Sequence, residues 1–178
     1  SISEILNVRS QIDQDILENA IETLVNAKRV EFYAFGGSAP VAMDGQHKFF
    51  RLKIPSSYIS DPHLQFMSAN SLERNDVVVA ISQSGTTTAL IESVKIVRKN
   101  GAKVIGIMPG ETPLANICDF PLTINVGINN RISKPVTSRI AYTAVIDVLT
   151  MGVAQLKPEA QDHLYNIADS QRSLKIDN

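Results

Sequence analysis

The sequence predicts an α/β fold in which a mostly parallel sheet is covered by helices on both faces. Short runs of aliphatic and aromatic residues alternate along the chain with segments of helix length. Three of these runs are apolar at nearly every position, as strands buried on both faces are. Parallel neighbours need a crossover connection, usually a helix, so the alternation predicts repeated strand–helix–strand units.

The elements can be placed in order along the chain. A first helix is expected over residues 10–28, with Ile16, Ala20, Leu24 and Ala27 along one side. Runs rich in β-branched and aromatic residues then predict the strands. These are expected at residues 30–35, 77–81, 104–108 and 122–126, with a weaker candidate at residues 57–59.

Three further segments have helical patterns. Leu90, Val94 and Val97 recur at helical spacing, and Asn100-Gly101 closes that helix because glycine takes the left-handed conformation common at helix ends. Residues 136–156 form a long helical segment that is apolar on most sides, which predicts burial in the core or against a partner. A last helix is expected over residues 159–170.

Composition indicates a soluble, cytoplasmic protein. The net charge is −1, from 17 basic and 18 acidic residues, so the chain lacks the basic surplus typical of nucleic-acid binding. The single Cys118 cannot form an internal disulfide, which fits a reducing compartment. No apolar run approaches the roughly 20 residues of a membrane span. No linker or repeat divides the chain, so we expect one domain over residues 1–178, with a core at about residues 14–156.

A polar loop follows the buried run at residues 77–81. Residues 82–87, Ser-Gln-Ser-Gly-Thr-Thr, stand where a strand ends and a helix begins. Helix N-termini attract anions through unpaired N–H groups, the hydroxyls add uncharged donors, and Gly85 permits close approach of the backbone. The loop therefore has the composition of a phosphate site, although it is not a GxxxxGK[ST] nucleotide loop. The alternative is that these residues only cap the helix.

A second loop of this kind favours the phosphate site over capping. Residues 36–40, Gly-Gly-Ser-Ala-Pro, follow the strand expected at residues 30–35. Ligands of parallel α/β proteins bind beyond the carboxyl ends of the strands, so two such loops are expected to face one crevice. A phosphosugar would suit that crevice.

These motifs resemble those of a known family. The run ISQSGTT at residues 81–87 is similar to the ISxSGxT phosphosugar loop of SIS (sugar isomerase) domains, and Gly36-Gly37-Ser38 resembles their first ligand loop. Further likeness to the effector domain of RpiR-type bacterial transcription regulators, in particular the HexR-like group, comes from three segments: DGQHKFFR (residues 44–51), TSRIA (residues 137–141) and VIDVL (residues 145–149).

The resemblance implies a flavodoxin-like three-layer sandwich with a five-stranded parallel sheet. It implies a ligand site made by Gly37, Ser38, Ser82, Gln83, Ser84, Gly85 and Thr87. Regulators of this type carry an N-terminal helix-turn-helix domain, through which they bind DNA. Here that domain is missing, so we expect an excised effector domain that forms a homodimer or higher oligomer.

A sugar isomerase is the alternative among the enzymes, because SIS isomerases move protons with a positioned base and acid. Candidate groups are His47, which shares a helix face with other charged residues, His63 and Glu111. They do not form a convincing base–acid pair, and Thr86 stands where many SIS enzymes have an acidic residue. No HExxH motif or Cys/His cluster suggests a metal, and no cofactor is expected. We therefore expect a regulator rather than an enzyme, with a purely structural dimerisation domain as the third possibility.

Cationic residues after the last strand complete the predicted site. Lys134, Arg139 and Arg131 lie on the same edge of the sheet as the two loops, and a solvated or ion-paired role is the alternative for each. A cation facing the crevice would suit the carboxylate of a phosphorylated sugar acid. The resemblance implies 2-keto-3-deoxy-6-phosphogluconate as that ligand.

Overall fold

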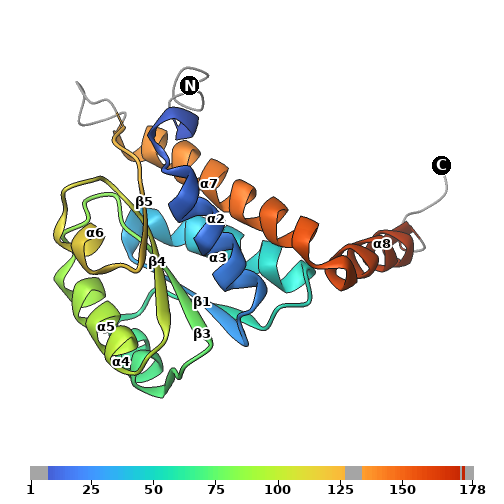
Figure 1. Ribbon diagram of the computed structural model, residues 1–178, viewed down its shortest axis with the longest axis horizontal. Helices are drawn as coiled ribbons and strands as arrows, with labels where there is room; N and C mark the ends of the chain where they lie inside the picture. Colours follow the sequence, from blue (N-terminus) through green and yellow to red (C-terminus); the bar gives the residue numbers. More distant parts are fainter. Residues whose placement is uncertain (1–7, 127–133, 173, 175–178) are drawn as a thin grey trace.

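A five-stranded parallel sheet forms the centre of the molecule (Figure 1). The computed structural model describes residues 8–126, 134–172 and 174, the side chains of residues 134–137 excepted. The strand order is β2-β1-β3-β4-β5, and each neighbouring pair is parallel. The strands are β1 (Arg29–Ala34), β2 (Ser56–Ile59), β3 (Asp76–Ile81), β4 (Lys103–Met108) and β5 (Phe120–Thr123).

Helices cover both faces of this sheet, so the predicted three-layer fold is confirmed (Figure 1). One face packs against α2 (Gln14–Val25), α3 (Ala39–Arg51) and α7 (Lys134–Leu156); the other packs against α4 (Pro62–Ser71), α5 (Thr88–Lys99) and α6 (Pro113–Ile117). Alternate residues of β3 serve the two cores: Val77, Val79 and Ile81 face the first, and Val78 and Ala80 the second. This double burial is why the strand is apolar throughout.

The long apolar helix α7 is a core helix along one side. Tyr142, Ile146 and Leu149 on that side are fully buried against the sheet, whereas Val148 and Met151 on the other side are exposed. By length and composition alone, residues Ser138–Leu156 would suffice to span a membrane, although no such segment was expected from the sequence. In the structure, one side of this helix packs on the sheet as part of the core.

The helix α4 was not predicted, because its apolar residues do not lie on one face. Leu64, Phe66 and Met67 are exposed, while Gln65 is buried and donates a 2.6 Å hydrogen bond to the Ile59 carbonyl. Apolar burial therefore cannot be the only force that holds this helix on the sheet.

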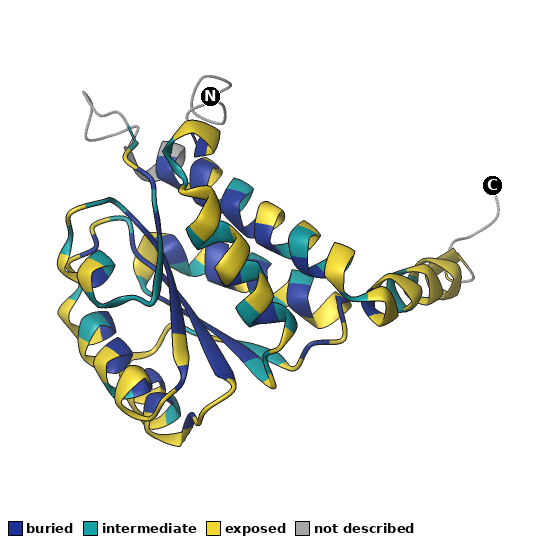
Figure 2. Ribbon diagram, viewed as in Figure 1, coloured by how far each residue is buried: buried dark blue, intermediate teal, exposed yellow. Residues whose placement is uncertain are grey.

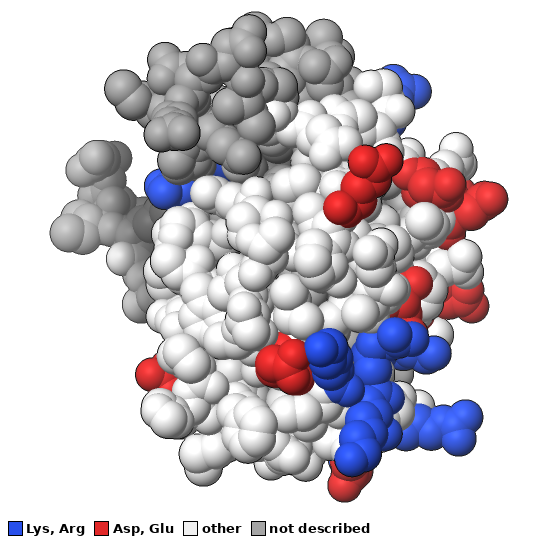
Figure 3. Space-filling model, turned by 90° about the vertical axis from the view of Figure 1, so that its left-hand side faces the viewer, with Lys and Arg blue, Asp and Glu red and all other residues white. Residues whose placement is uncertain are grey.

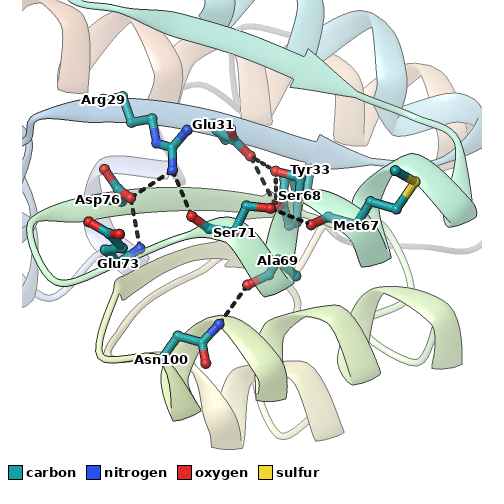
Figure 4. A network of polar contacts seen from close by, with 10 residues as sticks. All are labelled: Arg29, Glu31, Tyr33, Met67, Ser68, Ala69, Ser71, Glu73, Asp76 and Asn100. Carbon is teal, nitrogen blue, oxygen red and sulfur yellow. Dashed lines mark hydrogen bonds and ion pairs between the residues drawn. The ribbon is translucent and has the colours of Figure 1, made fainter.

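Polar contacts between α4 and β1 supply the rest (Figure 4). The Tyr33 hydroxyl lies 3.0 Å from Glu31 Oε2 and 2.9 Å from Ser68 Oγ, and Ser68 also donates to Glu31. Beside them, Arg29 joins the α4 carbonyl of Ser71 to the buried carboxylate of Asp76, each at 3.0 Å. Burial raises the pKa of Tyr33, so the hydroxyl stays protonated and able to donate.

The strand β5 begins two residues earlier than expected. The Asp119 carboxylate accepts the Val104 N–H at 2.8 Å, and the Asp119 N–H donates to the Val104 carbonyl at 2.9 Å. These two bonds fix the register, so that Phe120 pairs with Ile105. A polar residue before the apolar run therefore decides where the ladder starts.

A last helix, α8 (Pro158–Arg172), projects from the body of the molecule (Figures 1 and 2). Ala160 is buried and Leu164 packs partly against the core, but the helix is mostly exposed beyond them. Its existence was predicted; its projection was not.

Candidate functional site

The two polar loops meet at the carboxyl edge of the sheet, as predicted. The first contains the single 3₁₀ turn η1 (Gly36–Ser38) between β1 and α3, and the second joins β3 to α5. Because β1 and β3 are neighbouring strands, the loops lie side by side. A Cβ atom built on Gly37 would lie 3.6 Å from the amide of Gln83, which is ordinary contact distance.

A small cavity lies between these loops. Its volume is about 230 Å³, and it is lined by Phe35, Gly37, Ser38, Ile81, Ser82, Gln83, Ser84, Thr87 and Leu90. Six of the nine residues predicted for the site are among them. The lining includes no titratable side chain among the described residues. The cavity therefore offers hydroxyl, amide and backbone groups rather than an acid or a base.

The loop after β3 holds its hydroxyl groups through its own backbone. Ser82 Oγ accepts the Gly85 N–H at 3.0 Å, and Ser84 Oγ accepts the Thr86 N–H at 3.2 Å. A hydroxyl that accepts such a bond keeps its own hydrogen for donation. The two hydroxyl oxygens also lie 3.5 Å apart, where one hydroxyl can donate to the other. The loop thus keeps at least one O–H donor next to the N-terminus of α5.

Gly85 is required by the shape of this loop. Its φ is +65°, which favours glycine, and its carbonyl accepts the Leu114 N–H at 3.0 Å. A Cβ atom at this position would lie 2.3 Å from Thr112 Oγ1. Thr112 cannot easily move away, because its Oγ1 caps α6 through the Ala115 N–H. Gly85 does not line the cavity, so its contribution is to the backbone path.

The capping alternative is weakened by the geometry of the helix starts. Thr87 is the N-cap of α5 and Ser38 is the N-cap of α3, yet in the described structure neither side chain makes a capping hydrogen bond. Both residues line the cavity instead. At the start of α3 the Ala39 N–H donates to the Gly36 carbonyl and Pro40 has no N–H, so the start of α5 is the better anion site. A helix N-terminus whose N-cap side chain makes no capping bond, next to a cavity, favours an anion there.

The cationic part of the prediction stays a prediction. Arg139 is exposed near the start of α7 and does not line the cavity. Lys134 begins α7, but its side chain is outside the described residues, as is Arg131 altogether. The α7 helix contacts η1, which belongs to the first of the two loops.

The main basic cluster on the viewed face lies at the other end of the sheet (Figure 3). It surrounds the C-terminal end of α5 and a larger cavity of about 700 Å³, lined in part by Arg74, Lys99 and Lys103. The C-terminal residues Asn26 of α2 and Asn100 of α5 also line it. Helix C-termini carry partial negative charge, so basic residues here balance helix dipoles. This cavity is larger than the one between the two polar loops, but it is the poorer anion site because helix C-termini adjoin it.

The candidate catalytic groups are not brought to the cavity. His47 is exposed on α3, His63 is exposed at the start of α4, and Glu111 is exposed in the loop before α6. Beside His47, the ammonium of Lys48 joins Asp44 and Asp147, which ties α3 to α7. No group of three or more metal-ligating side chains occurs within the described residues.

Sequence reasoning missed the apolar floor of the cavity, made by Phe35, Ile81 and Leu90. The signal was available for two of them, since Phe35 and Ile81 directly precede the polar loops. Leu90 was recognised only as part of the apolar side of a helix, and it also belongs to the core.

Comparisons with known proteins agree with this geometry. The SIS domain family model matches residues 23–152. The HTH-type transcriptional regulator HexR of Escherichia coli (strain K12) is 35% identical over 172 residues, which cover 96% of this chain and 60% of that protein. The bifunctional protein glk of Burkholderia orbicola is 38% identical over 154 residues, covering 86% of this chain and 24% of that protein. The chain thus spans about 60% or less of the length of these relatives.

A solved structure extends the likeness to the whole described fold. Vibrio vulnificus NanR complexed with ManNAc-6P superposes with a TM-score of 0.90 at 20% identity, covering 99% of this chain and 67% of that chain. The resemblances predicted from residues 81–87 and 44–51 are therefore confirmed.

Proposed function

This chain belongs to the SIS domain family, and from that premise we propose that it is the phosphosugar-binding effector domain of a bacterial transcription regulator of carbohydrate metabolism. One observation carries the proposal: serine and threonine hydroxyls line a single cavity together with the N-cap residue of α5, whose side chain makes no capping hydrogen bond. The likeness to HexR, named as a transcriptional regulator, supports the regulatory role. In the whole protein, DNA binding would come from a helix-turn-helix part outside this chain, and the protein would be cytoplasmic and at least dimeric.

The proposed effector is 2-keto-3-deoxy-6-phosphogluconate or a related sugar phosphate. Its phosphate would lie at the N-terminus of α5, where Ser82, Ser84 and Thr87 donate hydrogen bonds, and Ser38 would face the sugar. Hydrogen bonds between hydroxyls and a charged phosphate are stronger than neutral ones. A carboxylate at the other end would need a cation, for which Arg139 and Lys134 are the proposed sources.

Binding is favoured over turnover by the lining of the cavity. A sugar isomerase needs a group that removes a proton next to the carbonyl, and no titratable side chain lines this cavity among the described residues. An isomerase or lyase is the second candidate, because one relative, glk, is named as a bifunctional protein and not as a transcriptional regulator.

Calorimetric titration tests the binding proposal. The ligands are 2-keto-3-deoxy-6-phosphogluconate, 6-phosphogluconate, fructose 6-phosphate and inorganic phosphate. We expect both sugar acids to bind more tightly than fructose 6-phosphate, and inorganic phosphate to bind least. Absence of heat and of competition for all four would contradict the proposal.

Proton exchange distinguishes a sensor from an isomerase. Fructose 6-phosphate and glucose 6-phosphate are incubated with the protein in D₂O and followed by proton NMR. A sensor leaves the C1 and C2 hydrogens in place, whereas an isomerase replaces one of them with deuterium. Catalytic exchange by the purified chain would overturn the non-enzymatic assignment.

A further inference from the structure

The loop at residues 109–112, which follows β4, packs against the loop after β3 at Gly85. The Leu114 N–H donates to the Gly85 carbonyl at 3.0 Å, and a Cβ atom on Gly85 would lie 2.5 Å from Thr112 Cβ and 2.7 Å from its Cγ2. The Gly85 N–H donates to Ser82 Oγ at 3.0 Å, and Ser82 lines the small cavity. The position of the Ser82 hydroxyl therefore depends on the position of the loop at residues 109–112.

The same loop is held from its other side by Asn125, which lies just beyond β5. The Gly110 N–H donates to Asn125 Oδ1 at 3.1 Å. Between Gly110 and Thr112, Glu111 has a φ of +56°, in the left-handed region that few residues other than glycine adopt. A residue keeps such a conformation when its surroundings determine it. Contacts with Gly85 on one side and with Asn125 on the other therefore fix the conformation of this loop.

Asn125 is paired in turn with Gln11, in the helical turn at residues 8–11. The Asn125 N–H donates to Gln11 Oε1 at 2.7 Å, and Gln11 Nε2 donates to the Asn125 carbonyl at 3.2 Å. We call this pair the Gln11–Asn125 clasp. Val8 of the same turn is buried in the core, which fixes the turn on the body of the molecule. In Figure 1 the turn lies at the dark blue end of the chain, next to the end of β5.

A sensor converts occupation of its site into a change elsewhere in the molecule. We propose that the loop at residues 109–112 couples the phosphosugar cavity to the helical turn at residues 8–11, because the clasp fixes this loop and the loop fixes Gly85. Coupling between two sites acts equally in both directions. The factor by which a ligand reduces opening of the clasp is therefore also the factor by which loss of the clasp reduces affinity. The inference rests on the proposed function, since it requires a phosphosugar in the cavity.

Matched glutamine substitutions test the coupling by calorimetric titration with 2-keto-3-deoxy-6-phosphogluconate. Gln11→Ala removes the clasp. Gln14→Ala removes the same side chain from an exposed position of α2, where it donates to Glu18 of its own helix, so this variant is the control. We expect Gln11→Ala to raise the dissociation constant about fivefold or more, the lower end of the range for coupled sites, and Gln14→Ala to leave it unchanged.

Amide hydrogen exchange of the wild type measures the same coupling from the other side. The Asn125 N–H donates to Gln11, so its exchange reports opening of the clasp. Saturating 2-keto-3-deoxy-6-phosphogluconate should slow this exchange by the factor by which Gln11→Ala weakens binding. The Asn26 N–H, which donates to the Glu22 carbonyl at the C-terminal end of α2, is the control and should exchange at the same rate with and without ligand.

Thr112→Ser keeps the test valid if Gln11→Ala does not fold. It keeps the oxygen that caps α6 but removes the methyl group next to Gly85, so the ligand should slow Asn125 exchange less in this variant than in wild type. Tight binding with equal affinity in wild type and Gln11→Ala, or unchanged Asn125 exchange at saturation, would overturn the coupling and leave the proposed function intact. Absence of binding to the wild type would contradict the proposed function and the coupling together.

Discussion

Ser82 and Ser84 use their oxygen atoms and their hydrogen atoms differently. The oxygen atoms accept backbone N–H groups of the loop, at 3.0 and 3.2 Å, and so hold the loop in shape. The two oxygen atoms also lie 3.5 Å apart, where one hydroxyl can donate to the other, so at least one hydrogen atom is left for a ligand. The two serines differ in exposure, since Ser82 is buried and Ser84 is exposed. A substitution at Ser82 therefore affects both loop and ligand, whereas one at Ser84 reports more purely on the ligand.

Ser84→Ala should weaken phosphosugar binding with little change in stability. Loss of one hydrogen bond to a charged group costs about 1.5–3 kcal/mol, roughly ten- to a hundredfold in affinity. Ser82→Ala should weaken binding similarly and also lower the melting temperature, because the buried Gly85 N–H loses its acceptor. Calorimetry and thermal unfolding measure the two effects. Thr86→Ala, in the same loop but outside the cavity, is the control; equal affinities in all three variants would leave the loop as a helix cap.

Arg139 is the residue whose role the fold leaves most open. It is exposed near the N-terminal end of α7, and α7 is the helix that contacts η1. Replacing it by Gln should reduce affinity for the sugar acid more than for fructose 6-phosphate, because a guanidinium pairs with a carboxylate through two hydrogen bonds. Paired titrations of wild type and variant measure the difference. Equal losses for both ligands would assign Arg139 to the phosphate or the fold, and no loss would place it outside the site.

At the scale of elements, the central strands could be predicted from the sequence, because burial on both faces makes them apolar throughout. The β3 run VVVAI is the clearest example, since its residues divide between two cores. The loops after β1 and β3 followed for the same reason, because a polar run after a buried strand marks the edge of the sheet. The helices α4 and α6 did not follow. α4 has no single apolar face and is held in part by polar contacts among Tyr33, Glu31 and Ser68, and α6 has only five residues.

The α3 helix approaches the sheet closely at Gly45, so a substitution at this position should lower stability. A Cβ atom there would lie 2.6 Å from Phe32 Cε1, and the Phe32 ring is fixed by an edge-to-face contact with Phe49 at 5.3 Å. Overpacking costs about 1–3 kcal/mol, whereas Ala gains at most about 1 kcal/mol over Gly in a helix. Gly45→Ala should therefore lower the urea midpoint.

A double variant identifies the cause of that loss. Phe32→Leu removes the ring atoms that the new methyl group would meet. The double variant should lose less free energy of unfolding than the two single variants lose in sum, because the smaller side chain at position 32 makes room for the methyl group at position 45. Strict additivity would mean that Gly45 matters through helix conformation rather than through its contact with Phe32.

At the scale of the whole molecule, alkaline pH should destabilise the fold. Burial, reinforced by the charge of Asp119, raises the pKa of Cys118 from about 9 to about 12. Burial also raises the pKa values of Tyr33 and Tyr142. As the pH rises, these groups lose their protons in the unfolded chain before they do so in the folded one. Their contribution to the free energy of unfolding is therefore complete below about pH 9 and is lost as the pH rises towards 12.

Urea unfolding at a series of pH values between neutrality and about pH 11 measures this effect. Cys118→Ala should reduce the loss of unfolding free energy with rising pH. The thiol of the folded wild type should also react slowly with thiol reagents at mildly alkaline pH. A stability that stays constant up to pH 11 would contradict the burial of these groups.

The packing of α7 and α8 is the part of the molecule that sequence alone left undecided. An apolar helix such as residues 136–156 can be apolar because of a core or because of a partner, and α7 has a fully buried side and an exposed apolar side. The spacing in α8 was visible in the sequence, but its projection from the body was not. Only the fold shows that Ile167 and Leu174 extend beyond the core that covers Ala160.

Backbone amide NMR of the protein during titration with 2-keto-3-deoxy-6-phosphogluconate tests the central claim most directly. The amides of Gly37, Gly85 and Thr87 report on the two loops, and that of Gly101 reports on the larger cavity at the opposite end of the sheet. We predict that the largest shifts fall within residues 36–38 and 82–88, while Gly101 stays unchanged. Shifts centred on Gly101 and its neighbours, or no shifts at saturating ligand, would contradict the assignment of the phosphosugar site.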